Sequence, residues 1–311
     1  MKRKTITKAI TREGVTLHSG NSSSITFRPS YFRRGILFYN TQRDPYKLHP
    51  IPLSPFIVSN TSFSTAIGND YRIYTIEHIL AALQAMEISD IIIEVEGDEV
   101  PVFDGSSYCF IEMLREAQIE ELDEEITPYI IKYPIWVYSE DKYIIGMPSS
   151  QFSITYSIDF SSKSDLLPYQ VAYFNITSDI FIREISRART FGFLEDYENM
   201  KQNNLARGGS LDNALIYTRE SILNDEIRYS NEALRHKILD LIGDLYLLGK
   251  PVVGHIIAHK AGHSLDVQFA KKFFWHEKAN ESSENIKRIL KDFDELSSKL
   301  KLSSFEKIKN N

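Results

Sequence analysis

The segment "RHKILDLIGDL", residues 235–245, places ionisable side chains at helical spacing inside an apolar pattern. His236, Asp240 and Asp244 recur every four residues, and each step turns the side chain by only about 40° around a helix, so all three lie on one side. Imidazole nitrogen and carboxylate oxygen are both zinc ligands, and one helix can supply two of them at this spacing. His236 and Asp240 are therefore candidate metal ligands, and Asp244 is placed to orient another group.

The same residues allow a second interpretation, a solvated helix face with ordinary i, i+4 ion pairs that include Arg235 and Lys237. The surrounding pattern leaves little room for such a face, because most neighbouring positions are apolar. These apolar positions are Ile238, Leu239, Leu241, Ile242, Leu245 and Leu248. Carboxylates buried among them would need partners. Spacing alone leaves both interpretations open.

Two further segments carry candidate acid–base groups. "TIEH" puts Glu77 directly before His78 at the start of another expected helix, where a glutamate can reach a water at a metal site without being a ligand. The alternative for Glu77 is a helix-capping carboxylate. His263, in the expected turn "KAGHS", can face a cleft and act as an acid. His255 and His259 would be ~13 Å apart along a strand, which is too far to share one ion.

Composition narrows the class of protein. With 311 residues, 42% of them hydrophobic, the chain can bury a core and form two domains. A net charge of -6 argues against a nucleic-acid-binding surface. The basic N-terminus is not followed by an apolar run, so we expect a cytoplasmic protein without a secretory signal or membrane anchor. One cysteine, Cys109, excludes an internal disulfide and a thiolate-rich zinc site.

The order of expected elements repeats along the chain. A helix, an apolar strand, a turn and a second helix occur in "TIEHILAALQAM" to "YCFIEMLREAQ" and again in "NEALRHKILDLIGDLYLLG" to "DVQFAKKFFWH". We therefore predict an α+β fold of two similar two-layer sandwich domains, each with a helix layer on a mostly antiparallel sheet. The predicted bounds are 1–124 and 125–277, with the boundary in "EELDEEITPY". Residues 278–311 are predicted to form a charged helical extension, because Ile286, Ile289, Leu290, Phe293, Leu296 and Leu300 stand at helical spacing.

Two segments between these elements indicate ligand contacts. "ISRARTFGF" offers a hydroxyl, aromatic rings and cations to a phosphorylated, partly apolar ligand, although it could also be a plain edge strand. "ARGGSLDNALIY" contains Gly208 and Gly209, which favour a sharp turn or a close approach of backbone.

Six segments, "TIEHILAAL", "VPVFDGS", "SRARTFGF", "GGSLDNAL", "RHKILDLIGDL" and "HKAGHSL", together resemble the UDP-3-O-acyl-N-acetylglucosamine deacetylases, zinc enzymes of lipid A synthesis. The resemblance spans residues 4 to 270 and implies an active site between the two domains, with a small insert in each domain. It implies that His78, His236 and Asp240 bind Zn²⁺, or Fe²⁺ in the cell. The catalytic residues that it implies are Glu77 as base, Thr190 and His263 as oxyanion stabilisers, and His263 as an acid held by Asp244. This displaces the ion-pair and capping interpretations.

The resemblance also implies substrate contacts. Lys237, Lys142 and Lys260 would lie near the diphosphate, Phe160 at the uracil end, and Phe191 and Gly209 in the glucosamine pocket. The 3-O-acyl chain would run along Leu194, Tyr197, Met200, Ala206, Ala214 and Ile216, with Leu17 at the mouth. The chain departs from the family pattern at Ser64, where many members have a cysteine, and at Tyr197, which is larger than an expected aliphatic residue.

Two other classes of function compete with this hypothesis. One is a non-catalytic nucleotide-sugar or acyl-chain binding protein, which we disfavour because ligands, base and acid are all present. The other is a zinc hydrolase of a different amide such as a peptide, which would need neither the cations nor the apolar passage. We expect a monomer, and the sequence predicts neither the preferred acyl length nor the role of residues 278–311.

Overall fold

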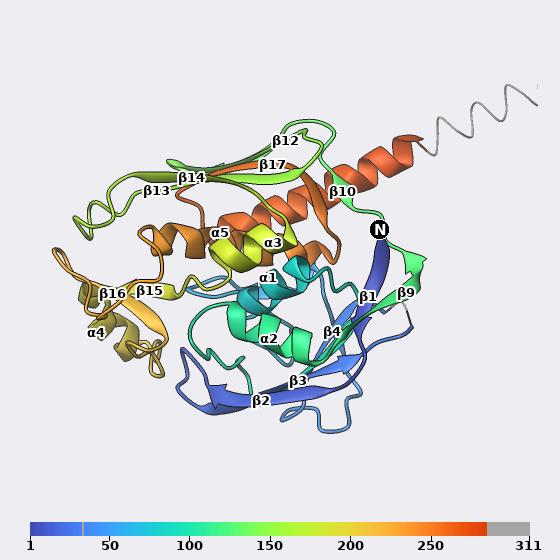
Figure 1. The fold of residues 1–311 in the computed structure, drawn as a ribbon, viewed down its shortest axis with the longest axis horizontal. Helices are drawn as coiled ribbons and strands as arrows, with labels where there is room; N and C mark the ends of the chain where they lie inside the picture. Colours follow the sequence, from blue (N-terminus) through green and yellow to red (C-terminus); the bar gives the residue numbers. More distant parts are fainter. Residues whose placement is uncertain (33, 285–311) are drawn as a thin grey trace, which may run out of the picture. The chain divides into compact units, whose positions relative to one another are not determined.

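The computed structural model describes residues 1–32 and 34–284. By contacts the chain divides into one unit, Met1–Lys271, and a second unit that begins at Lys272. The first unit contains two main mixed sheets packed with helices (Figure 1). The predicted α+β class is confirmed, and in each sheet all but one of the main-path strand pairs are antiparallel.

The N-terminal sheet has β8 at its centre and helices on either side of β8 in the chain. Its strands, in order across the sheet, are β2 (Ile10–Val15), β3 (Ser22–Pro29), β8 (Ile91–Glu96), β4 (Ile36–Asn40) and β5 (Ile51–Pro52). Helix α1 (Glu77–Ala85) precedes β8 and α2 (Tyr108–Glu116) follows it. A 3₁₀ turn (Pro55–Ile57) and a small hairpin, β6 (Val58–Asn60) with β7 (Ala66–Ile67), are inserted before α1. The segment "IPLSPFIVSN" forms two short strands with a 3₁₀ turn between them and not one long strand, because proline cannot donate a hydrogen bond within a sheet.

The second sheet follows the same plan around β17. Its order is β11 (Ile135–Ser139), β12 (Lys142–Met147), β17 (Val252–His259), β13 (Phe152–Ile158) and β14 (Gln170–Asn175), with β10 (Tyr129–Ile130) parallel to the start of β17. Helix α5 (Glu232–Leu245) precedes β17, and a helix begins at residue 263 and is described to residue 284. Along the five-strand path of each sheet, leaving out β10, the chain order of the strands is first, second, fifth, third, fourth, and the third and fifth are the parallel pair.

Shorter elements complete the chain. They are β1 (Lys2–Ile6) paired with β9 (Ile119–Glu125), α3 (Ser178–Ile180) with a π-helical turn (Phe181–Ile185), the parallel pair β15 (Thr190–Phe193) and β16 (Ala214–Tyr217) with α4 (Leu194–Gln202) between them, and a 3₁₀ turn (Tyr246–Leu248).

The histidine predicted to lie in a turn, His263, is instead the first helical residue, because the helix starts earlier than the apolar pattern indicated. Residues 285–311, including Ile286 to Leu300 of the predicted extension, lie outside the described residues. Among the described residues, every helix is too short or too polar to cross a bilayer.

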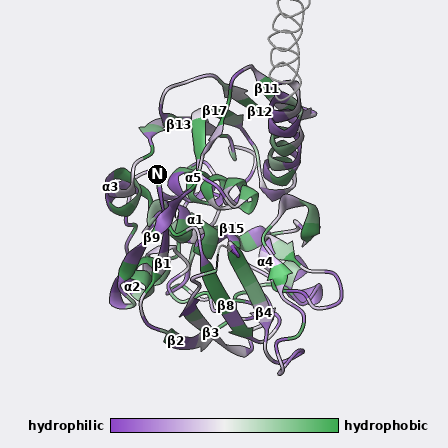
Figure 2. Cartoon of the chain, turned by 90° about the vertical axis from the view of Figure 1, so that its right-hand side faces the viewer, coloured by the Kyte–Doolittle hydropathy of each residue, from purple (hydrophilic) through white to green (hydrophobic). Residues whose placement is uncertain are grey.

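The core lies along the central strands and the helices between the two sheets. Hydrophobic residues concentrate on β4 and β8 (Figure 2), and every residue of β4 is buried. Helix α1 buries eight of its nine residues and α5 buries twelve of its fourteen. Because α1 and α5 lie between the sheets (Figure 1), almost no position on either helix faces water. Polar side chains on these two helices are therefore dry and need partners.

Helices α1 and α5 cross at Gly243, where their backbones touch. A Cβ atom on Gly243 would lie 2.1 Å from the carbonyl oxygen of Glu77, well inside van der Waals contact. Only glycine permits this approach. The crossing brings the first turn of α1, which carries Glu77 and His78, against the C-terminal half of α5.

Replacing Gly243 by alanine tests this crossing. Alanine would favour the helix by about 1 kcal/mol, but the clash is with backbone and cannot be relieved by a rotamer change. We expect Gly243→Ala to lower the free energy of unfolding by about 1–3 kcal/mol and to reduce metal retention, measured by thermal melting and elemental analysis. Gly192→Ala is the matched control, because a Cβ there has nothing within 4 Å. Equal melting temperatures for the two variants would contradict the close crossing.

Candidate metal centre and active site

Three side chains from α1 and α5 converge on one point. The Nε2 atoms of His78 and His236 lie 3.7 and 3.3 Å from Oδ1 of Asp240, and the two imidazole rings are 4.9 Å apart at 86°. All three side chains are buried. Two nitrogens and one carboxylate oxygen within 4.8 Å of one another form a ligand set of the kind that holds a catalytic zinc ion, with a coordination position left for water or substrate.

His236 and Asp240 each have a second polar atom, and hydrogen bonds to neighbouring groups occupy it. Nε2 of His236 and Oδ1 of Asp240 are therefore left to face a metal ion. Lys237 donates from Nζ to Oδ2 of Asp240 at 2.8 Å, and His236 bonds through Nδ1 to the carbonyl oxygen of Ala188 at 3.0 Å. Within the described chain, Oδ1 of Asp240 is buried without a hydrogen-bond partner. A buried carboxylate oxygen in that state costs free energy unless a cation accompanies it. The residues present therefore fit a divalent metal such as Zn²⁺.

The electrostatics keep this group in the protonation states that a metal requires. Burial lowers the pKa of His78 to about 3, with His236 adding to the shift, and burial also lowers the pKa of His236. Burial alone would raise the pKa of Asp240, but His236 and Lys237 together bring that pKa below its ordinary value. Neutral imidazoles and an ionised carboxylate are the forms that bind metal.

Glu77, the first residue of α1, is 2% exposed beside this centre. Its Oε2 accepts a hydrogen bond from the backbone N–H of Thr65 at 3.0 Å. Burial raises the pKa of Glu77 to about 8, and the positive charge of His263 opposes that rise. A dry carboxyl group with a pKa near neutrality is suited to accept a proton.

His263 and Asp244 form an ion pair that is separate from the His78, His236 and Asp240 group. Nδ1 of His263 is 2.8 Å from Oδ2 of Asp244, whose Oδ1 accepts a hydrogen bond from the hydroxyl of Thr65 at 2.6 Å. Burial would lower the pKa of His263, but the Asp244 carboxylate outweighs it and the pKa rises to about 10. His263 is therefore cationic at neutral pH and can donate a proton from Nε2.

Asp244, His263 and the fully buried Asp266 also lie close enough to hold an ion. In this group Asp244 and His263 bond to each other directly, at 2.8 Å. Sequence reasoning missed Asp266 and Thr65. Asp266 follows His263 by one helical turn, which is the signal that could have found it. Thr65 stands in the irregular stretch before β7 and has no pattern around it.

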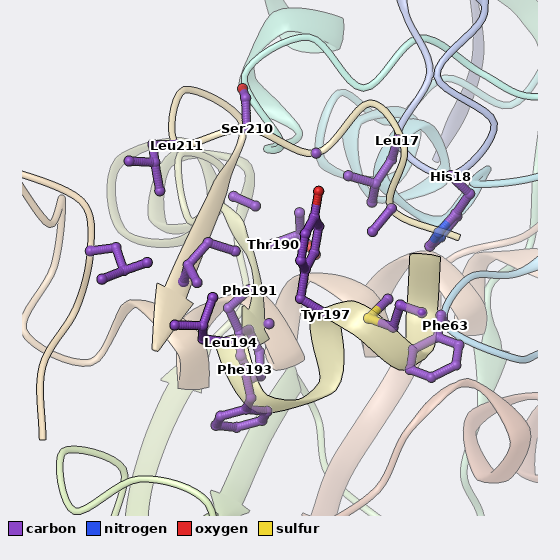
Figure 3. A pocket seen from close by; sticks show the side chains of 17 residues that line it. Leu17, His18, Phe63, Thr190, Phe191, Phe193, Leu194, Tyr197, Ser210 and Leu211 are labelled. Atoms are coloured by element: carbon purple, nitrogen blue, oxygen red, sulfur yellow. The ribbon is translucent and has the colours of Figure 1, made fainter. Parts of the chain in front are cut away.

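An apolar cavity of about 270 Å³ opens beside these groups (Figure 3). Thr190, Phe191, Gly209 and Leu17, expected at the substrate, all line it. So do the six residues of the predicted acyl passage, Leu194, Tyr197, Met200, Ala206, Ala214 and Ile216, together with His18 and Phe63, which sequence reasoning did not include. Tyr197 stands among the labelled side chains with its ring inside the cavity (Figure 3).

Tight backbone contacts shape this cavity. The N–H of Thr190 donates to the carbonyl oxygen of Gly105 at 2.9 Å, which fixes the start of β15 against the "FDGS" turn. Gly208 makes the close approach predicted for the glycine pair, because a Cβ there would lie 2.0 Å from the carbonyl oxygen of Thr16. Gly209 instead turns the chain at the cavity wall, with its N–H donating to Ala206.

The expected diphosphate cations separate into two places. Lys260 pairs with Asp141 at 3.0 Å and Asp159 at 3.4 Å, and Lys142 begins the neighbouring strand at the same end of the sheet. Lys237 lies against the metal centre, where its ammonium contacts Asp240. Burial would lower the pKa of Lys237, but Asp240 and Tyr156 raise it above its ordinary value, so this lysine stays charged.

Aromatic rings connect the cavity to the metal centre. Phe160 lies 5.6 Å from Phe191 and 5.4 Å from Phe193, measured between ring centroids. Phe191 in turn meets the ring of His236 edge-on at 6.3 Å. The structure therefore places both expected aromatic contacts, Phe160 and Phe191, in one cluster next to a metal ligand.

A buried His–His–Asp group beside a carboxyl base, a histidinium acid and an apolar cavity is the arrangement of a metal-dependent hydrolase for a partly apolar substrate. Residues 3–275 match the family model described as UDP-3-O-acyl N-acetylglycosamine deacetylase. The chain belongs to this family, and it is a zinc-dependent amide hydrolase.

Curated relatives agree with the family model. The chain is 45% identical over 271 residues to the UDP-3-O-acyl-N-acetylglucosamine deacetylase of Leptospira biflexa, which covers 86% of this chain and 88% of the relative. It is 41% identical to the enzyme of that name from Idiomarina loihiensis, with the same coverage. It is 39% identical over 276 residues to that of Vibrio parahaemolyticus, covering 87% and 89%.

Metal analysis tests the ligand set. We expect the purified chain to contain about one zinc per molecule and His236→Ala to lose most of it, because truncation removes one of three ligands. His49→Ala is the control, since His49 lies outside this group with 67% of its side chain exposed. Elemental analysis after dialysis measures both variants. Full zinc retention by His236→Ala, or loss by His49→Ala, would contradict the assignment.

Proposed function

We propose that this centre hydrolyses the acetamide of its substrate with Glu77 as base and the His263–Asp244 pair as acid, on a metal held by His78, His236 and Asp240. The reaction is removal of the N-acetyl group from UDP-3-O-acyl-N-acetylglucosamine with release of acetate, the committed step of lipid A biosynthesis. The observation that supports these roles best is the buried Oδ1 of Asp240, which faces two imidazole nitrogens without a partner.

The base acts on the water that attacks the acetamide carbonyl carbon. Bound Zn²⁺, or Fe²⁺ in the cell, supplies Lewis-acid chemistry that polarises the acetamide carbonyl and acidifies water. Glu77 takes the proton from the attacking water. The N–H of Thr65 holds the Glu77 carboxylate in place, and the surrounding apolar residues exclude bulk water from it. Lys237 keeps Asp240 ionised and oriented by binding its second oxygen.

His263, as the acid, completes the reaction. The Thr190 hydroxyl and the cationic His263 stabilise negative charge as it develops on the carbonyl oxygen. His263 then gives its Nε2 proton to the departing amine, and Asp244 keeps the imidazole charged and correctly oriented through Nδ1. The pKa of Glu77, about 8, lies below that of His263, about 10, so between these values Glu77 is ionised as a base while His263 keeps the proton of an acid.

The substrate roles follow from position and chemistry. We assign the acyl chain to the apolar cavity, with Leu17 at its mouth, and the glucosamine to Phe191 and Gly209. Phe160 suits a uracil ring, while Lys142 and Lys260 suit the diphosphate. Lys237 is also expected at the diphosphate, but its charge is already paired with Asp240. We therefore assign Lys237 to the support of Asp240 at the metal centre.

The domain organisation is also a proposal. We infer that residues 1–124 and 125–277 are two duplicated sandwich domains, with residues 278–311 as a helical extension. The shared strand order of the two sheets supports this, and ligands drawn from both α1 and α5 support a site between the domains. We further propose a cytoplasmic monomer that acts on a diffusing UDP-sugar. The single cysteine suits a reducing compartment.

Removing the acid tests the division of roles. We expect His263→Ala to reduce kcat by about 100-fold or more while zinc content stays near one per chain, because general acid catalysis supplies about 10²–10⁴. Acetate release and elemental analysis on the same preparation measure both quantities. If His263→Ala lost zinc as completely as His236→Ala, the separation of acid from ligands would be wrong.

Asp244→Asn should shift the pH dependence. The carboxylate of Asp244 is the main group that raises the pKa of His263 to about 10, against the effect of burial. Without that charge the pKa falls, so His263 loses its proton at lower pH and the alkaline limb of kcat/KM moves toward neutrality by about 1–3 units. A pH–rate profile with zinc saturating measures this shift. An unmoved alkaline limb would assign that limb to another group.

A further inference from the structure

Thr65 contacts both proposed proton-transfer groups at once. It lies between β6 and β7 of the small inserted hairpin, and its side chain is fully buried. Its backbone N–H donates to Oε2 of Glu77 at 3.0 Å, and its hydroxyl donates to Oδ1 of Asp244 at 2.6 Å. Asp244 then bonds to His263 at 2.8 Å. One residue therefore connects the base to the acid pair.

The polar atoms of Thr65 are all engaged. Its carbonyl oxygen accepts from the N–H of Ile76 at 3.2 Å, which ties the residue to the turn that opens α1. Thr65 and Asp244 are 179 positions apart in sequence, and Asp244 lies on helix α5. The hydroxyl is therefore a cross-link between the separate two-stranded β6–β7 hairpin and helix α5, next to Glu77 and His263.

We propose that Thr65 is a positioning residue that sets the acid pair relative to the base by holding Oδ1 of Asp244. This inference rests on the proposed roles of Glu77, Asp244 and His263. The hydroxyl satisfies one oxygen of a fully buried carboxylate, so the other oxygen stays directed at Nδ1 of His263. Without the Thr65 hydroxyl, the Asp244 carboxylate would be free to rotate toward another donor. Nε2 of His263 would then no longer be directed at the departing amine.

The chain offers a clean pair of variants. Thr65→Val keeps the shape and the backbone N–H to Glu77 but removes the hydroxyl, whereas Thr65→Ser keeps the hydroxyl. We expect Thr65→Val to lower kcat by about 10- to 100-fold with KM within about twofold of wild type and zinc near one per chain. Thr65→Ser should stay within about threefold of wild-type kcat. Thr5→Val is the matched control, because Thr5 is equally buried and its hydroxyl accepts from the N–H of Ser30 outside the site.

A double-mutant cycle separates positioning from general destabilisation. If Thr65 acts through Asp244, adding Thr65→Val to Asp244→Asn should lower kcat by less than about twofold, because the group that it holds is already changed. If Thr65→Val does not fold, Thr65→Ala is used in the same cycle.

Three results would overturn the proposal: a wild-type kcat for Thr65→Val, an undiminished effect in the Asp244→Asn background, or a loss of kcat in Thr5→Val as large as in Thr65→Val. A wild-type kcat for Asp244→Asn itself would instead reject the proposed acid pair. The failure of the positioning role and the failure of the proposed acid are therefore distinguishable.

Discussion

The backbone contact between α1 and α5 at Gly243 is the constraint on which the rest of the centre depends. A metal ligand set needs atoms a few ångströms apart, and two helices that carry ordinary side chains at their crossing keep their axes 8–10 Å apart. Glycine at the crossing removes that spacing, so His78 from one helix meets His236 and Asp240 from the other. Glu77 is at the contact itself, which puts its carboxylate beside the group that could hold a metal ion.

The same arrangement also buries the ionisable side chains of α1 and α5, and this burial determines their protonation states. Both helices lie between sheets, so the ionisable groups on them are cut off from water and must be satisfied by one another. Lys237 satisfies one oxygen of Asp240, Ala188 one nitrogen of His236, and Thr65 one oxygen each of Glu77 and Asp244. These fixed partners leave each group with a single atom directed at the reaction. Burial raises the pKa of Glu77, whereas the Asp244 carboxylate raises the pKa of His263 against the effect of burial.

The periodic elements and the residues on them were predictable from the sequence. Spacing of four on α5 places His236, Asp240 and Asp244 together, and strand spacing on β17 excludes His255 and His259 as a metal pair. Contacts across the chain were not predictable, because nothing local in "TSFSTAI" indicates that Thr65 meets a residue 179 positions away. The contact of Lys237 with Asp240 follows from their i, i+3 spacing, whereas the family resemblance implies a place for Lys237 near the diphosphate. His263 was assigned to a turn because "KAGHS" contains glycine, whereas the helix begins at that histidine.

The shared strand order of the two sheets has a consequence for how this protein can change over time. Each half contributes a helix to the centre, yet the groups they bring are unlike: α1 carries Glu77 and His78, while α5 carries His236, Asp240 and the Asp244 carboxylate that bonds to His263. Neither half holds a complete set, so neither can be exchanged or lost while the other retains the activity. A substitution that reorients one sheet alters ligand, base and acid together. Because each half supplies groups that the other lacks, the two halves can change only together.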